Sequence, residues 1–116
     1  MEIKRRRVDD IMILDISGEI IIGKGDVILR KEINDLVMEG EVWILLNLQR
    51  VPFIDSAGIG QIVACHTTVT RAGGDLKLLN LSKKIRELLT ITKLIMVLDT
   101  YSDFDEAILS FKDQNA

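Results

Sequence analysis

A continuous apolar segment in the middle of the chain constrains the fold most strongly. It runs from Val42 to Leu48, begins Val-Trp-Ile-Leu-Leu, and has a polar residue, Asn47, only near its end. Strands that are apolar throughout are usually buried on both faces, as in a sheet covered by helices. Apolar residues recur at helical spacing just before this segment. These are Leu29, Ile33, Leu36 and Val37.

The rest of the chain alternates between strand-like and helix-like segments. Further strands are predicted at Glu2–Val8, Ile11–Ile16, Leu76–Leu79 and Leu94–Leu98. Helices are predicted after Gly25, from Ser56 to Gly73, after Ser82 and after Ser102. Expected helix ends are a cap at Asp26, a stop at Gly40, a cap at Ser82 and a capping box over Ser102–Asp105. This order predicts an α/β fold with a mixed sheet that is parallel in its centre.

Composition narrows the class of protein. The 116 residues carry a net charge of -3, which argues against a general binder of nucleic acids or anionic membranes. The one basic run, Lys4 to Arg7, falls in a predicted edge strand, where cations discourage aggregation. Cys65 is the single cysteine and no residues have metal-ligand spacing, so we expect no disulfide, metal or cofactor. Charged residues follow Met1 directly and no apolar run could span a bilayer, which predicts a cytoplasmic protein.

The segment Phe53–Gly60 carries the functional signal. Gly58 and Gly60 fall in the first turns of a predicted helix, where each costs on the order of 1 kcal/mol relative to alanine. One interpretation is tight packing against the preceding strand. The other is that the backbone of a partner approaches this turn closely.

One face of the same predicted helix has no charge until Arg71. Ser56, Gly60, Ala64 and Thr67 follow one another at helical spacing on it. A solvated face would carry lysines and glutamates, so this face suits docking against another protein; a second buried face is the alternative. The predicted core stripe of the helix is Ile59, Ile62, Val63, His66, Val69 and Thr70. Cys65 is interpreted as a small packing residue.

Residues Val51–Gly60, Val-Pro-Phe-Ile-Asp-Ser-Ala-Gly-Ile-Gly, closely resemble the motif of STAS domains, specifically of bacterial anti-sigma factor antagonists. The element order, the Gly73-Gly74-Asp75 entry to a strand and the closing Asp-Glu-Ala helix extend the resemblance over nearly the whole chain. The resemblance implies a single STAS domain over residues 1–116, an α/β fold whose mixed central sheet has helices packed mainly on one face. It also implies a regulatory protein that is not an enzyme.

In such proteins the serine matching Ser56 is phosphorylated by a partner that is both kinase and anti-sigma factor. The unmodified antagonist binds that partner and frees a sigma factor, and a phosphatase resets the modified form. The resemblance and the uncharged helix face together give the expected partner-binding residues: Asp55, Ser56, Ala57, Gly58, Gly60, Ala64 and Thr67. Two acids common in the family are replaced here, by Asn47 and Ile21. Their loss predicts less efficient phosphorylation and no change in fold.

Three other functions could use parts of this sequence. A serine hydrolase is disfavoured because Ile54 stands where a nucleophile elbow needs glycine, and because His66 lies about 15 Å along the helix from Ser56. A phosphate-binding loop over Gly18–Gly25 is one residue short, and Gly25 replaces its Ser/Thr. The remaining alternative is a STAS scaffold or accessory subunit of another signalling or transport complex.

Overall fold

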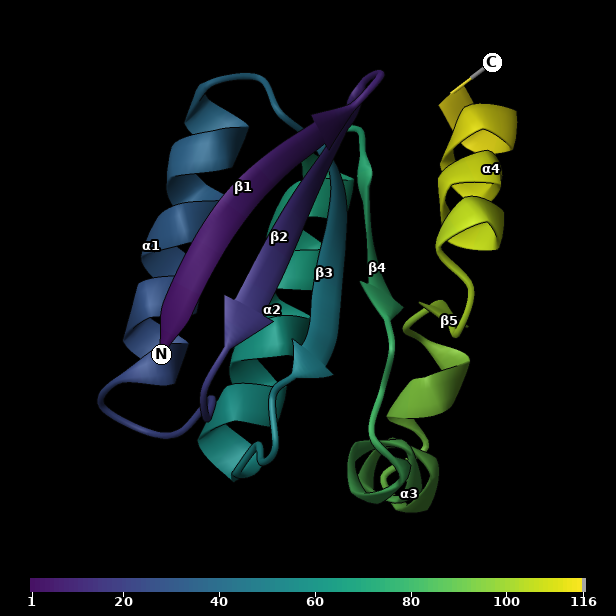
Figure 1. Cartoon of the computed structure of the whole chain (residues 1–116). Helices are drawn as coiled ribbons and strands as arrows, with labels where there is room; N and C mark the ends of the chain where they lie inside the picture. Colours follow the sequence, from purple (N-terminus) through teal and green to yellow (C-terminus); the bar gives the residue numbers. More distant parts are fainter. Residues whose placement is uncertain (116) are drawn as a thin grey trace.

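The computed structural model describes residues 1–115 and contains a five-stranded sheet in the order β1-β2-β3-β4-β5. The strands are β1 (Glu2–Val8), β2 (Ile11–Ser17), β3 (Trp43–Arg50), β4 (Asp75–Leu79) and β5 (Thr100–Tyr101). β1 is antiparallel to β2, and every other neighbouring pair is parallel. The carboxyl ends of β2, β3 and β4 therefore lie together, at the lower end of the view in Figure 1. This is the mixed, centrally parallel sheet that the sequence predicts.

Helices cover the two faces of this sheet unequally. They are α1 (Gly25–Met38), α2 (Ser56–Arg71), α3 (Lys83–Ile91) and α4 (Phe104–Asn115), with a short 3-10 turn at Leu94–Met96. α1, α2 and α3 contribute to one large apolar cluster, and α1 and α2 lie behind the sheet in Figure 1. α4 packs on the opposite face, where it contributes to a smaller cluster. The prediction that helices lie mainly on one face is confirmed.

The two clusters explain why the central strand is apolar at consecutive positions. Ile44 and Leu46 of β3 belong to the large cluster, together with Leu29 and Ile33 of α1. Leu45 points the other way and packs in the cluster that includes Phe111 of α4. Since side chains alternate along a strand, a run that is buried on both faces has no polar position.

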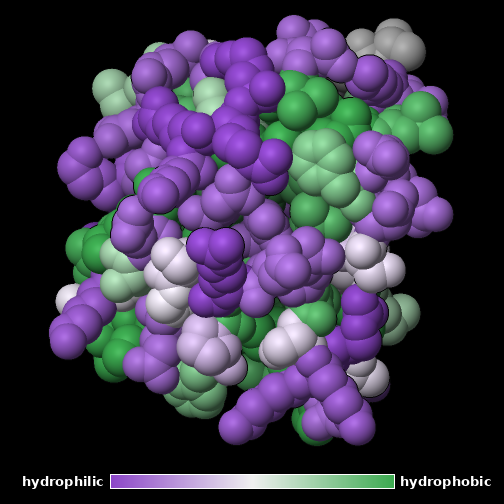
Figure 2. All heavy atoms as spheres, viewed as in Figure 1, coloured by the Kyte–Doolittle hydropathy of each residue, from purple (hydrophilic) through white to green (hydrophobic). Residues whose placement is uncertain are grey.

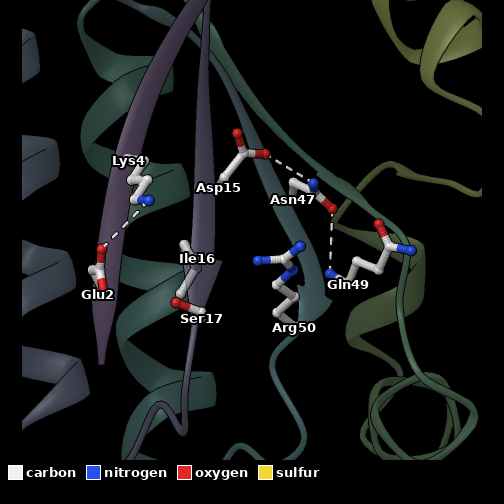
Figure 3. A pocket seen from close by; sticks show the side chains of 8 residues that line it. All are labelled: Glu2, Lys4, Asp15, Ile16, Ser17, Asn47, Gln49 and Arg50. Atoms are coloured by element: carbon white, nitrogen blue, oxygen red, sulfur yellow. Dashed lines mark hydrogen bonds and ion pairs between the residues drawn. The ribbon is translucent and has the colours of Figure 1, made fainter.

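α4 covers only part of its face of the sheet. Beyond it, the polar side chains of β1, β2 and β3 line an open hollow of about 350 Å³ (Figure 3). Its lining includes Asp15, Ser17, Asn47, Gln49 and Arg50. Figure 2 shows the same side of the molecule as largely hydrophilic over the centre of the sheet. Polar residues thus occupy the strand positions that no helix covers.

The basic run lies in the edge strand β1, as predicted, and its arginines are held by ion pairs. Arg5 pairs with Glu32 and Glu39, and Arg7 with Glu41. Arg6 points to the other face, where it pairs with Asp15 and lies 5.4 Å from the centre of the Phe104 ring. These cations fasten the edge strand to its neighbours, so the run is no free cationic patch.

The predicted strand at Leu94–Leu98 is wrong. Residues 94–96 form the 3-10 turn, and the last strand is the short β5. The β4 strand and the residue after it bond to this region: the Leu78 N–H donates to the Asp99 carbonyl oxygen, and the Asn80 N–H donates to the Tyr101 carbonyl oxygen. Within the segment only Leu98 is fully buried, while Met96 and Val97 are exposed. Lys93, in the left-handed region at φ 63°, lies between α3 and the 3-10 turn, so the chain changes direction before the predicted strand could form.

Predictions of helix ends were mixed. Ser82 accepts a hydrogen bond from the Ile85 N–H, and Gly40 follows α1 at φ +83°, as expected. Asp26 does not cap α1, because it lies inside the first turn and accepts only from the neighbouring Val27 N–H. At α4, Asp103 rather than Ser102 accepts the Glu106 N–H. Side chains one residue apart offer the same acceptor chemistry, so the pattern alone misplaces the cap.

The core stripe of α2 also differs from the prediction. Ile59, Ile62 and Val69 are buried, but Thr70 is exposed and His66 is only half-buried. Cys65 takes the core position instead and is 2% exposed, which confirms its interpretation as a packing residue. The side of α2 that faces the core is therefore shifted toward Cys65 and away from His66 and Thr70.

Candidate switch and docking site

Asp55 joins two segments at the start of α2. It is the N-cap, and its Oδ1 accepts the Gly58 N–H at 2.8 Å. Its Oδ2 accepts the Ile22 N–H at 2.9 Å, which holds the loop after β2 against the helix start. These hydrogen bonds from backbone amides lower the pKa of Asp55 from its ordinary value of 3.8, and the bond from Ile22 has the largest effect. The carboxylate is thus kept charged beside Ser56.

Ser56 is the first residue of α2 and is exposed. Its hydroxyl makes no hydrogen bond to any part of the chain that the structure describes, and Asp55 supplies the cap. The side chain is therefore free for modification without loss of a capping bond. The N-terminus of a helix also favours negative charge, because free amides and the helix dipole point there.

The two glycines of the motif have different roles. A Cβ at Gly58 would lie 2.1 Å from the Ile20 carbonyl oxygen and 2.7 Å from Cγ2 of Ile54. Ile20 and Ile54 form an isolated parallel bridge, so Gly58 lets the helix pack onto that bridge. A Cβ at Gly60 would meet nothing within 4 Å. Tight packing accounts for the glycine at position 58, whereas the space beside Gly60 is open and could be approached by a partner.

The uncharged face of α2 is a surface of the molecule. Ser56, Gly60 and Ala64 are exposed, which contradicts the alternative of a second buried face. Thr67 is half-buried and its Oγ1 donates to the Val63 carbonyl at 3.1 Å. Ala57 and Asp55 are half-buried, and Gly58 is buried. Of the predicted partner-binding residues, Gly58 therefore offers no surface of its own.

The two positions where family acids are absent lie in different surroundings. Ile21 is in the loop that Asp55 holds, next to Ile22. Asn47 points to the sheet face opposite α2, where its Nδ2 donates to Asp15 Oδ1 at 2.9 Å and its Oδ1 accepts the Gln49 N–H (Figure 3). Asp15 thus places a carboxylate beside Asn47, and the bond from Arg6 lowers the pKa of that carboxyl group.

Asp15 and the Ile22 amide were missed by sequence reasoning. Asp15 was visible only as one late charge in an apolar strand, and its neighbour Asn47 depends on the strand register. The Ile22 contact is made by a backbone amide, for which a sequence carries no signal.

The residues that the other functions would need have structural surroundings of their own. His66 Nε2 lies 3.4 Å from Asp75 Oδ1, so this histidine has a partner on β4. Burial raises the pKa of the Cys65 thiol. Gly25, in the incomplete phosphate loop, is buried, and a Cβ there would lie 2.7 Å from the Glu19 carbonyl oxygen. Among residues 1–115 no group of three metal-ligating side chains occurs, and no helix is long and apolar enough to cross a membrane.

The fold and this site define a class of regulatory domain. The sequence profile of the STAS domain matches residues 2–107, and the chain belongs to the STAS domain family. Among curated proteins it is similar to the anti-sigma-B factor antagonist of Bacillus subtilis, with 34% identity over 95 residues, covering 82% of this chain and 84% of the relative.

Solved structures agree with the fold. A crystal structure described as a candidate anti-sigma factor antagonist from Thermotoga maritima superposes with a TM-score of 0.89 at 27% identity, covering 95% of this chain and 94% of that one. The anti-sigma factor antagonist SpoIIAA in its unphosphorylated form superposes with a TM-score of 0.71 at 19% identity, covering 94% and 96%. The predicted fold class is confirmed.

Proposed function

We propose that this protein is an anti-sigma factor antagonist: it binds an anti-sigma factor while Ser56 is unmodified and so frees a sigma factor. The observation that carries the proposal is the exposed, uncharged face of α2 that begins at Ser56, whose hydroxyl makes no hydrogen bond to the described residues. The B. subtilis relative, which bears the name of such an antagonist, supports the same assignment.

Phosphorylation of Ser56 acts through charge. A phosphate adds about −1.5 to −2 charges and three acceptor oxygens. The helix N-terminus accommodates this charge, so the fold changes little. A partner packed on the uncharged face would have to strip water from the phosphate next to the ionised Asp55. A loss of roughly 3 kcal/mol corresponds to binding weakened more than a hundredfold.

We further propose how Ser56 is modified and restored. The anti-sigma factor is itself the serine kinase that modifies Ser56, and a separate phosphatase removes the phosphate. The protein acts in the cytoplasm and catalyses no reaction of its own. Ile21 and Asn47 make the modification slower than in relatives with acids at both positions.

Phosphopeptide mapping after incubation with the cognate anti-sigma factor and ATP tests the site. Ser56→Ala abolishes modification and retains binding, because it removes only a hydroxyl. Ser56→Asp weakens binding by less than the true phosphate does, since it adds less charge. Ser102→Ala, an exposed serine before α4, is the matched control and changes neither. Modification at another residue refutes the site, and tight binding without any modification refutes the switch.

A further inference from the structure

An apolar groove lies beside the start of α2. It runs between the segment Pro52–Ile54 and α3 and has a volume of about 260 Å³. Its apolar lining is Pro52, Phe53, Ile54, Ile85, Leu88 and Ile91. Ile91 is 79% exposed and Phe53 is 39% exposed. Ile54 and Ile85 are buried at its floor, so Phe53 and Ile91 are the large apolar side chains that the groove leaves most open to solvent.

The groove lies at the same end of the molecule as the start of the proposed docking face. Phe53 stands three residues before Ser56 in the same connection between β3 and α2. Ile22, whose amide binds Asp55, is 72% exposed and belongs to the loop that packs on the start of α2. All of these residues lie at the carboxyl ends of the parallel strands, where α3 is also found (Figure 1). Apolar side chains gathered at one end of a protein mark an interaction surface.

The charges around the groove specify the chemistry of its occupant. α3 carries three cations, Lys83, Lys84 and Arg86, and one acid, Glu87, in a chain whose net charge is -3. None of the three cations forms an ion pair within residues 1–115, whereas Arg5, Arg6 and Arg7 all do. Lys84 Nζ lies 5.7 Å from the centre of the Phe53 ring, at the groove itself.

A second hollow on α3 extends the surface. It has a volume of about 410 Å³ and shares Glu87 and Ile91 with the groove. Lys83, Arg86 and Thr90 complete its lining. Ile91 therefore stands between two hollows, with unpaired cations beside both of them.

We propose that this surface receives a second contact from the same anti-sigma factor. This inference rests on the function proposed above. The contact is an acidic segment that places a large aliphatic or aromatic side chain in the groove and carboxylates against Lys84 and Arg86. The opposite charges steer the two proteins together, and burial of Phe53 and Ile91 provides affinity at a distance from Ser56. Partner choice then depends on α3, while the switch depends on α2.

Binding measured by calorimetry against the anti-sigma factor that modifies Ser56 tests this surface. Ile91→Glu places an acid between the hollows and weakens binding at least tenfold, about 1.4 kcal/mol. The double variant Lys84→Gln, Arg86→Gln weakens binding less but flattens its dependence on salt, because it removes charges that face acids. Met38→Glu, at an 87% exposed apolar residue on the far end of α1, is the control and leaves affinity unchanged.

The outcomes separate the two proposals. Absence of any binding by the unaltered protein overturns the proposed function and this surface with it. Tight binding that Ser56→Asp weakens and Ile91→Glu leaves unchanged overturns only the surface on α3. Sedimentation of all variants adds one more outcome: if Ile91→Glu only dissociates a homodimer, the groove belongs to a second copy of the chain and the proposal is wrong. Thermal melting confirms that each variant is folded.

Discussion

Gly58 and Gly60 show how two identical residues, two positions apart in the same helix, serve opposite purposes. Gly58→Ala forces a methyl group onto the Ile20 carbonyl oxygen and the Ile54 side chain. Such overpacking lowers the free energy of unfolding by about 1–3 kcal/mol. Gly60→Ala places its methyl group in open solvent. There the better helix propensity of alanine raises the free energy of unfolding by about 1 kcal/mol.

Urea denaturation of both variants measures these changes. The pair controls for itself, because both substitutions add the same group to the same helix. If the free energy of unfolding changed in the same direction in both variants, the packing described for Gly58 and Gly60 would be contradicted. Gly60→Ala also brings a methyl group to the proposed docking face, so its affinity for the partner falls although its stability rises.

The sequence left both glycines open to two interpretations for a physical reason. The atom that a side chain at Gly58 would approach most closely is the carbonyl oxygen of Ile20, which is distant in sequence and is brought close by pairing with the segment around Ile54. The cap at Ser82 and the stop at Gly40 were predictable because their hydrogen bonds are local. The role of Asp15 was not predictable either, because its partners Arg6 and Asn47 come from other strands and are distant in sequence or depend on the strand register.

At the scale of one element, the start of α2 depends on the ionisation of Asp55. Its pKa is lower in the folded protein than its ordinary value of 3.8. Its charge therefore stabilises the fold fully above pH 3.8, and this contribution is lost as the pH falls through the lower folded value. Asp55→Asn keeps an oxygen to accept the Gly58 N–H but has no charge to lose.

We expect the unaltered protein to lose more stability than Asp55→Asn does between about pH 5 and about pH 3. Urea denaturation across this range measures the difference. Asp113→Asn, an exposed acid of α4, is the control and follows the unaltered protein. Parallel curves for all three proteins would show that the Ile22 and Gly58 amides do not stabilise the carboxylate.

Elements were predictable where their apolar pattern was long. The apolar run predicted β3 and the helical spacing predicted α1, because the apolar side chains that make up these patterns are buried or, as at Val37 and Trp43, half-buried. β5 consists only of Thr100 and Tyr101, which are half-buried, so no apolar pattern marks it. The segment just before it, Leu94–Leu98, is more apolar and so carries the strand-like pattern. Its side chains pack mostly around α3 or remain exposed rather than entering the sheet.

At the scale of the whole molecule, the smaller apolar cluster around α4 lies apart from the proposed docking surfaces on α2 and α3. Phe111 of α4 is 1% exposed, and its ring meets Trp43 edge-on at 6.5 Å between centres. The same ring lies 4.7 Å from Nζ of the buried Lys77, which also donates to Ser110 Oγ at 2.9 Å. α4 is thus held to the sheet by one cluster, on the face opposite α2.

Phe111→Ala leaves a cavity in this smaller cluster and lowers the free energy of unfolding by about 3–5 kcal/mol. Affinity for the anti-sigma factor stays the same in the folded fraction, because the cluster shares no residue with the start of α2 or with α3. Calorimetric binding at low temperature and thermal melting measure the two effects separately. Ile91→Glu is the reciprocal control, with affinity reduced and the melting temperature retained.

The bond between the Ile22 amide and Asp55 also gives the protein a built-in spectroscopic reporter. The resonance frequency of an amide proton responds to the charge and position of its acceptor, and this acceptor adjoins Ser56 in the chain. A nitrogen-15 spectrum should therefore distinguish unmodified from modified protein by the Ile22 cross-peak alone. The state of the switch could then be followed in real time, in a mixture with unlabelled kinase and phosphatase, without a dye, an antibody or a fused tag.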